Sequence, residues 1–541
     1  MRTARTVLEQ KIRERRMTFE EFTEFAETFA RKHGEPGTLS ARHLQRLASG
    51  RGEGGRSLGD VRPATARLLE RIFGVSVDEL LTTPATNSDS PGTGLEPLPI
   101  QASHGRDERA HVGEGAGFGP ADREAAGVAG WVPKAARLEV GRRLSTLDLG
   151  ALRDRRIRLE TLDRSRLARA LADYYGYDRS AGWLYAPSVD GRTVQTSVLT
   201  RREWVDLAIP LGPETDRIAL CDVELDTVGR IEHVDGGHAA DRLAEAAMLG
   251  VRITNKPLYR LLDVDIRDGV ISGSVGLAPF GVYALTMDLL ERELTDAVVN
   301  GRATAPGELP LRDRYLPDVG SVLDLESRLC AGGVVSLCAI ARPADMYRGD
   351  ADYALLVQER SEQVLNAAGR LAVIPKGFHE PLRDVSADAR IGATLRREME
   401  EELFGRVEVD STAGDCSIAA PMHPSRLSEP MRWLTAAPGR MRMECTGFGL
   451  NLMSGNYEFA SLIVIDDEEF WPRYGGLVEA NWEAAGLRVY SSLDDQLLGK
   501  LASDESWSNE GLFAFLQGLR RLQDLGGPRV SLPAVSLWSG G

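Results

Sequence analysis

The chain has 541 residues, of which 43% are hydrophobic, so its composition is that of a globular protein large enough for three or four domains. Its formal net charge of −15 argues against nucleic-acid binding by the chain as a whole. A positive balance occurs at the N-terminus, where residues 1–80 carry fifteen Lys/Arg and twelve Asp/Glu. Five scattered cysteines and the lack of any run of eighteen apolar residues predict a cytoplasmic protein that makes no contact with a membrane.

The first eighty residues are predicted to form five short helices. Residues 7–12 show helical spacing of apolar side chains, and capping boxes begin at Thr18 and Ser76. A third helix spans 39–50, with leucines facing inward and a glycine at its end. Pro63 is placed to open a fourth helix. These signals predict an all-α head over residues 1–81.

The end of this head, residues 71–81, resembles the last two helices of the phage-repressor type of helix-turn-helix, also called the xenobiotic-response-element family. The resemblance implies that 39–50 is a recognition helix for double-stranded DNA. The outward side chains that it implies for contact with bases or phosphates are Arg42, His43, Gln45 and Arg46. The alternative is a small helical interaction bundle in which these side chains are only solvated.

Residues 82–130 are rich in Gly, Pro, Ser and Thr, which predicts a flexible, disordered linker. An α+β middle region of unknown role is predicted for 131–310, and a long amphipathic helix at 285–299 suggests docking or homodimer formation. The sequence 232–238 could suggest a metal site, but a polar turn with His238 near a helix N-cap is favoured.

A strand, a loop and a helix are predicted in that order within residues 371–405. The apolar run 371–374 is typical of a short strand. Ile391, Leu395, Met399 and Leu403 then recur every four residues, which predicts a helix with one apolar stripe. Three glutamates crowd a neighbouring face of this helix at i, i+3 and i+4, namely Glu398, Glu401 and Glu402. Such an oxygen cluster suits Mg²⁺ or Mn²⁺.

The hexapeptide 397–402, Arg-Glu-Met-Glu-Glu-Glu, resembles the centre of the Nudix box. The resemblance implies a hydrolase of nucleoside diphosphate derivatives that holds a magnesium ion through Glu398, Glu401 and Glu402. It further implies catalytic roles for Glu401 and Glu402, and an orienting role for Arg397. Residues 311–526 are therefore expected to form a Nudix-like α/β/α sandwich, followed by a tail at 527–541.

This sequence also departs from the family pattern. The family glycine lies fourteen residues before the arginine, whereas Gly377 lies twenty before Arg397. Ala389 occupies the position of a family glutamate, and Phe404 that of a glycine. The altered box favours sensing over turnover. The expected protein is therefore a DNA-binding transcriptional regulator that acts on DNA as a homodimer and whose C-terminal domain senses a nucleotide-like ligand.

Two other hypotheses remain open. An active magnesium-dependent Nudix hydrolase would use the head only as a tether. A protein-binding scaffold would need neither activity, and the glutamates would then form an ordinary solvated helix face.

Overall fold

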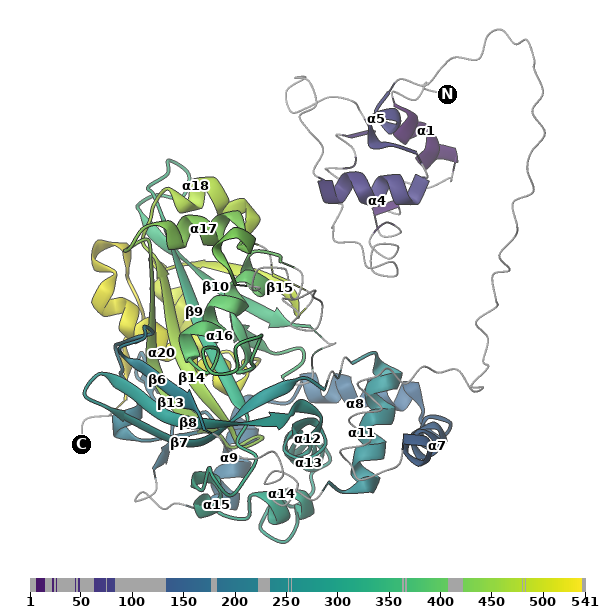
Figure 1. Cartoon of the computed structure of the whole chain (residues 1–541), viewed down its shortest axis with the longest axis vertical. Helices are drawn as coiled ribbons and strands as arrows, with labels where there is room; N and C mark the ends of the chain where they lie inside the picture. Colours follow the sequence, from purple (N-terminus) through teal and green to yellow (C-terminus); the bar gives the residue numbers. More distant parts are fainter. Residues whose placement is uncertain are drawn as a thin grey trace, which may run out of the picture. The chain divides into compact units, whose positions relative to one another are not determined.

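The computed structural model divides the chain into two compact units, residues 1–109 and 110–541, shown in Figure 1. In the first unit the structure describes residues 6–14, 63–73 and 75–82, together with residues 22, 23, 26, 44, 47 and 48. In the second unit it describes 133–176, 182–221, 234–406 and 422–537, except for 252, 254, 362, 363, 365, 366, 479 and 482.

The first unit has its own small core. Its described helices are α1 (Val7–Glu14), α4 (Pro63–Phe73) and α5 (Val77–Leu80). Phe22 stacks on Phe73 with ring centroids 5.3 Å apart. The buried side chains around this pair are Leu8, Ile12, Ala26, Leu44, Leu47, Leu68, Leu69, Ile72 and Leu80. The helix predicted to open at Pro63 is thus confirmed as α4. Two of the leucines predicted to face inward from 39–50, Leu44 and Leu47, are described, and both are buried.

A large mixed sheet forms the centre of the second unit. Among the described residues it has ten strands, with the order β1-β4-β13-β14-β9-β10-β11 and with β12, β15 and β5 paired to β9, β10 and β13. The parallel pair is β14 with β9, and the other pairs are antiparallel. The strands from 332 onward are β9 (Gly332–Arg342), β10 (Asp352–Arg360), β11 (Leu371–Val373), β12 (Lys376–Phe378), β13 (Met441–Asn451), β14 (Asn456–Ile465) and β15 (Ala484–Ser491). The strand predicted at 371–374 is confirmed as β11.

The middle region contributes to the same sheet. Its strands β1 (Trp183–Leu184), β4 (Val198–Thr200) and β5 (Ile209–Pro210) extend the β13 edge, with Leu199 opposite Leu450. The sequence-based boundary at 310/311 therefore runs through a shared unit.

Helices cover both faces of this sheet. Along β9, Val334 and Cys338 belong to one buried cluster, whereas Val335 and Leu337 belong to another, as strand alternation requires. Helix α16 (Ile391–Glu398) packs against β12 and β9 within the first cluster. Helix α20 (Asn509–Leu525) packs against β14, β9, β11 and β13 within the second. The two faces are called the α16 face and the α20 face below.

The rest of the middle region is α+β, as expected from the sequence. A three-stranded sheet has the order β6-β8-β7, with β6 (Asp216–Leu220), β7 (Pro257–Arg267) and β8 (Val270–Pro279). The helices are α7 (Pro133–Leu144), α8 (Leu149–Glu160), α9 (Arg164–Tyr175), α11 (Gly236–Leu249), α12 (Phe280–Ala284), α13 (Asp288–Val299), α14 (Pro310–Tyr315) and α15 (Val319–Leu323).

The predicted helix at 285–299 is confirmed as α13, but its apolar face is not available for docking. Leu289, Leu290 and Leu294 are at most 3% exposed and belong to the core of the α16 face. The apolar stripe that suggested a dimer surface is therefore buried by the chain itself, and that interpretation of the stripe is wrong.

Short elements complete the second unit (Figure 1). They are β2 (Ser188–Val189), β3 (Arg192–Thr193), α17 (Glu429–Ala436), α18 (Phe470–Tyr474), α19 (Asp495–Ala502) and β16 (Val535–Ser536). Strand β16 pairs with β2, which joins the end of the described chain to an early segment of the unit. In the part of the chain that the structure describes, no helix is long and apolar enough to cross a membrane.

Candidate functional site

The segment that carries the three glutamates begins at β12, passes through a loop and enters α16, which continues as a π-helical segment, Met399–Leu403. The predicted apolar stripe of this helix is completely buried. Its carboxylates are buried as well, because Glu398 is 5% exposed and Glu402 is 0% exposed. The alternative of an ordinary solvated helix face is therefore wrong.

Gly377 in β12 lies directly against the side chain of Glu398. A Cβ atom added at this glycine would lie 2.1 Å from the Glu398 carboxyl carbon, far inside van der Waals contact. A larger residue at this position would therefore displace the carboxyl group of Glu398. Although the loop is longer than the Nudix pattern expects, Gly377 and Glu398 still meet.

Arg397 contacts the helix, the strand and the loop that form this site. Its Nη2 donates to Oε1 of Glu398 at 2.6 Å and to the carbonyl oxygen of Phe378 at 2.9 Å. Its Nη1 lies 3.8 Å from a carboxylate oxygen of Glu380, a loop residue that the sequence patterns did not single out. Although burial opposes it, the carboxylates of Glu398, Glu380 and Glu401 raise the pKa of Arg397. Arg397 thus acts as an anchor between helix, strand and loop.

Glu402 bonds to the same strand but keeps one oxygen without a partner. Its Oε2 accepts a hydrogen bond of 2.6 Å from the backbone N–H of Lys376. Its Oε1 is buried and has no hydrogen-bond partner among the described residues. Burial, together with the neighbouring carboxylates of Glu483 and Glu398, raises the pKa of Glu402 well above its usual value. Burial likewise raises the pKa of Glu398 to about 8, despite its ion pair with Arg397.

These carboxylates fit a hard divalent cation only in part. The donors are oxygens, and Oε1 of Glu402 is a buried acceptor that is not used. The described residues, however, contain no group of three His, Cys, Asp or Glu side chains arranged to hold a metal ion. Mg²⁺ commonly takes one or two protein carboxylates and fills its other positions with water and ligand phosphates. Glu402, with Glu398 and the half-buried Glu401 beside it, would hold a cation in that manner.

The remaining glutamate of the hexapeptide, Glu400, has a structural role. Its Oε1 accepts hydrogen bonds from the backbone N–H and the hydroxyl of Ser428, at 3.0 and 2.9 Å. Its Oε2 lies 3.4 Å from Arg406. Glu400 thereby ties the box segment to the residues that precede α17.

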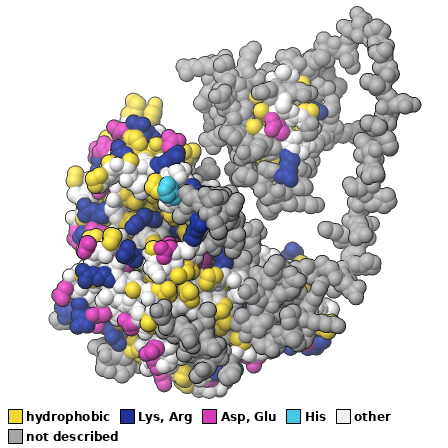
Figure 2. All heavy atoms as spheres, in the orientation of Figure 1, with side chains coloured by type: hydrophobic (Ala, Val, Ile, Leu, Met, Phe, Trp, Pro, Cys, Tyr) yellow, Lys and Arg dark blue, Asp and Glu magenta, His cyan; other side chains and the backbone are white. Residues whose placement is uncertain are grey.

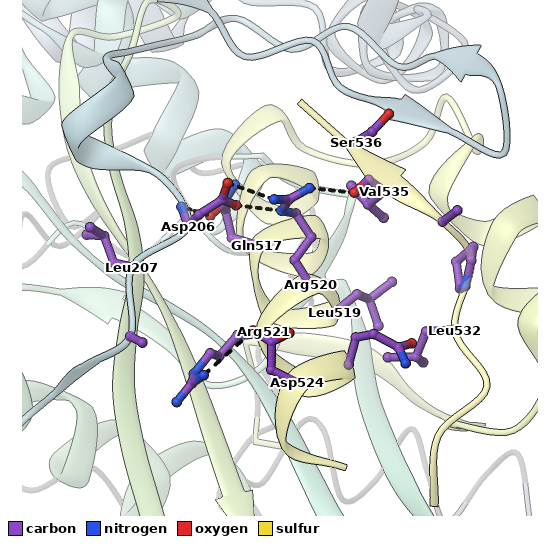
Figure 3. Close-up of a pocket in the computed structure, with 14 residues that line it drawn as sticks. Asp206, Leu207, Gln517, Leu519, Arg520, Arg521, Asp524, Leu532, Val535 and Ser536 are labelled. Carbon is purple, nitrogen blue, oxygen red and sulfur yellow. Dashed lines mark hydrogen bonds and ion pairs between the residues drawn. The ribbon is translucent and has the colours of Figure 1, made fainter. Parts of the chain in front are cut away.

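A cavity of about 490 Å³ lies along α20 on the other face of the sheet. Figure 3 shows that Arg520 is already engaged, because it pairs with Asp206 and donates to the carbonyl oxygen of Val535. The other arginine, Arg521, pairs with Glu444 of β13. Because both arginines already have carboxylate partners, this cavity offers little to an anionic ligand.

The predicted DNA contacts, Arg42, His43, Gln45 and Arg46, lie outside the described residues. In the second unit, basic and acidic side chains are interspersed over the coloured part of the visible face (Figure 2). At 234–238, Asp235 caps α11 by accepting from the backbone N–H groups of Gly237 and His238. The favoured polar turn, with His238 near the N-cap, is confirmed there.

Comparison with known proteins adds no assignment. No family model matches the sequence, and a search of curated proteins finds no match.

Proposed function

We propose that this chain is a DNA-binding transcriptional regulator whose C-terminal unit binds a nucleoside diphosphate or a related diphosphate through a divalent cation. The observation that carries the ligand half of the proposal is the unpartnered oxygen of Glu402. A buried carboxylate oxygen without a partner costs free energy, and a bound cation would remove that cost. Glu398 and Glu401 would assist, and Arg397 would hold Glu398 in place.

The ligand half of the proposal is tested by titration calorimetry of the full chain with Mn²⁺ and ADP. The parent is expected to bind ADP only when the cation is present. Glu402→Gln is expected to weaken this binding at least about tenfold, because it removes the anionic oxygen that the cation needs. Glu510→Gln is the control, since Glu510 is another buried carboxylate, on the α20 face. Binding that is independent of the cation, or equal in the parent and Glu402→Gln, contradicts the assignment.

The DNA half rests on the helical head with its own core, on its positive balance and on the resemblance of residues 71–81 to a repressor-type helix-turn-helix. Two heads on a symmetric operator would supply useful affinity, so the active form would be a homodimer. Selection of bound genomic fragments should enrich specific sites, and Arg42→Ala or Arg46→Ala should weaken binding to them. An exposed arginine of the other unit, Arg432, provides the control substitution. If the protein binds DNA without enriching specific sites, and both arginine variants bind DNA as the parent does, the head is better explained as a helical interaction bundle.

Regulation requires that ligand and DNA affect each other's binding. A ligand that shifts operator affinity tenfold supplies about 1.4 kcal/mol of coupling, and operator DNA must shift ligand affinity by the same factor. Fluorescence anisotropy on operator DNA, with and without the cation and ADP, measures this coupling.

The alternative of an active hydrolase is favoured by one observation, the contact of Gly377 with Glu398. This contact shows that strand and helix meet despite the lengthened loop. Rapid cation-dependent cleavage of a nucleoside diphosphate derivative, lost in Glu402→Gln, would establish this alternative.

A further inference from the structure

A second hollow lies on the α16 face, between α16 and α17. Its volume is about 310 Å³, at the lower end of the range for small-molecule sites. One part of the wall is apolar and consists of Leu382, Met422, Pro424, Leu427 and Met431. The polar part comes mainly from α16, which contributes Thr394, Arg396 and Arg397.

Arg396 in this wall has no partner in the described structure. It makes no hydrogen bond or ion pair with any described residue, and its Nε is buried without an acceptor. Asp216 is near enough to influence its charge but forms no ion pair with it. Burial lowers the pKa of Arg396, although a guanidinium remains charged at neutral pH. A largely buried cation without a counter-charge is costly unless a ligand supplies one.

Two neighbouring groups also offer unused donors to this cavity. Among the described residues, neither the hydroxyl of Thr394, which is 2% exposed, nor Nε of Arg397 has a hydrogen-bond partner. The two carboxylates in the wall are already engaged. Glu380 faces Arg397, and Oδ2 of Asp388 accepts the backbone N–H groups of residues 382, 383 and 384. The cavity therefore presents spare donors beside an apolar wall.

We propose that the cavity between α16 and α17 binds a small organic anion, a carboxylate or phosphate monoester with an apolar group, through Arg396 and Thr394. The guanidinium and the hydroxyl would bind the anionic group, and the methionines and leucines would cover the apolar group. The site needs no metal ion and does not depend on the proposed nucleotide function. It lies one helical turn from Glu398 and shares Arg397 with the glutamate site, so its occupant would act on the same helix.

The test uses the full chain in buffer with EDTA, which removes any cation-dependent binding. The probes are benzoate and phenyl phosphate, with benzyl alcohol as the neutral counterpart and inorganic phosphate as the anion that lacks an apolar group. Calorimetry or ligand-observed NMR should detect one of the two aromatic anions with a Kd below about 10 mM, a range that ligands of roughly nine to eleven heavy atoms can reach. Which aromatic anion binds more tightly distinguishes a carboxylate ligand from a phosphate ligand.

The variants locate the binding. Arg396→Gln should weaken binding of the preferred probe at least about tenfold, as expected for loss of a charge-assisted hydrogen bond, and Arg396→Lys should recover part of it. Thr394→Val should weaken it several-fold. Arg432→Gln, at an exposed arginine of α17, is the matched control and should bind like the parent. The melting temperature of Arg396→Gln without ligand should be equal to or above that of the parent, because the variant removes a largely buried charge that has no ion pair with any described residue.

The proposal is overturned if neither aromatic anion binds with a Kd in this range. It is also overturned if benzyl alcohol or inorganic phosphate binds as tightly as both aromatic anions, or if Arg396→Gln binds the preferred probe as tightly as the parent.

Discussion

Two buried carboxylates, one on each face of the sheet, differ in the number of partners they have. On the α20 face, Glu510 accepts from the Lys376 ammonium at 2.5 Å and from the Asn451 amide at 3.1 Å. On the α16 face, Glu402 has one backbone partner and one unused oxygen. Although burial opposes it, Lys376 lowers the pKa of Glu510, whereas burial and neighbouring carboxylates raise the pKa of Glu402. A satisfied network of this kind is typical of structural stabilisation, and an incomplete one is typical of a binding site.

Removal of the cation on the α20 face should have the largest effect. Lys376→Met leaves Glu510 buried without its ion pair and should lower the free energy of unfolding by about 3–5 kcal/mol. The double variant Lys376→Met/Glu510→Gln should be more stable than Lys376→Met alone. Chemical denaturation measures both, with the exposed Lys500→Met as the control. If Lys376→Met is as stable as the parent, the network is not structural and the contrast between the faces is lost.

The α16 face should also make stability depend on pH through His379. Burial, followed by the charge of Arg397, lowers the pKa of this histidine to about 3. The unfolded chain therefore binds more protons below about pH 6.5, so stability is complete above that pH and decreases as the pH falls. The loss should reach about 2 kcal/mol at pH 5.

Substitution of this histidine separates its contribution to the pH dependence of stability from that of the other titratable groups. His379→Phe keeps an aromatic ring at this position, where the imidazole centroid lies 4.4 Å from the ring centroid of Tyr259. The variant's free energy of unfolding should depend less on pH between pH 7.5 and 5 than that of the parent. His238→Gln, at an exposed histidine, serves as the control. If the free energy of unfolding of His379→Phe falls with pH as steeply as that of the parent, the histidine is not buried in its neutral form.

A methyl group at Gly377 tests the approach of β12 to α16. Gly377→Ala displaces the Glu398 carboxyl, which Arg397 holds, and should cost about 1 kcal/mol of unfolding free energy. It should also weaken cation-dependent ligand binding. Gly486→Ala is the matched control, because a Cβ there meets no atom within 4 Å. Equal stability and equal binding in Gly377→Ala would show that Glu398 is free to move.

An exposed ion pair should have the smallest effect. Arg488 and Glu359 are 2.9 Å apart, and both side chains are more than two-fifths exposed. Arg488→Ala should change the free energy of unfolding by no more than about 0.5 kcal/mol, because water already solvates both charges. A loss comparable to that of Lys376→Met would show that burial does not control the strength of these pairs.

Local patterns predicted much of the structure, because apolar spacing alone indicates which side of an element is buried. The stripe from Ile391 to Leu403 is buried, and the strand predicted at 371–374 is present as β11. The same patterns do not indicate what covers an apolar face, so the stripe of α13 looks the same in the sequence whether a second copy or the chain's own core covers it.

Long-range partners were not predictable from spacing either. Glu380 lies seventeen residues before Arg397, and Glu483 lies on a distant segment, so their proximity to the glutamates depends on the folded loop and sheet. The spare donors of Arg396 and Thr394 are equally invisible in the sequence, since a side chain without a partner is recognised only when its surroundings are known.

The shared sheet has a consequence for synthesis of the protein. Leu199 pairs with Leu450, and Val189 pairs with Val535 near the end of the described chain. These early strands leave the ribosome long before their partners exist, and edges without partners promote aggregation. Folding of such distant pairings is slow. A fragment that begins at residue 311 would likewise lack the strands that border β13, so this unit should be expressed as one continuous piece.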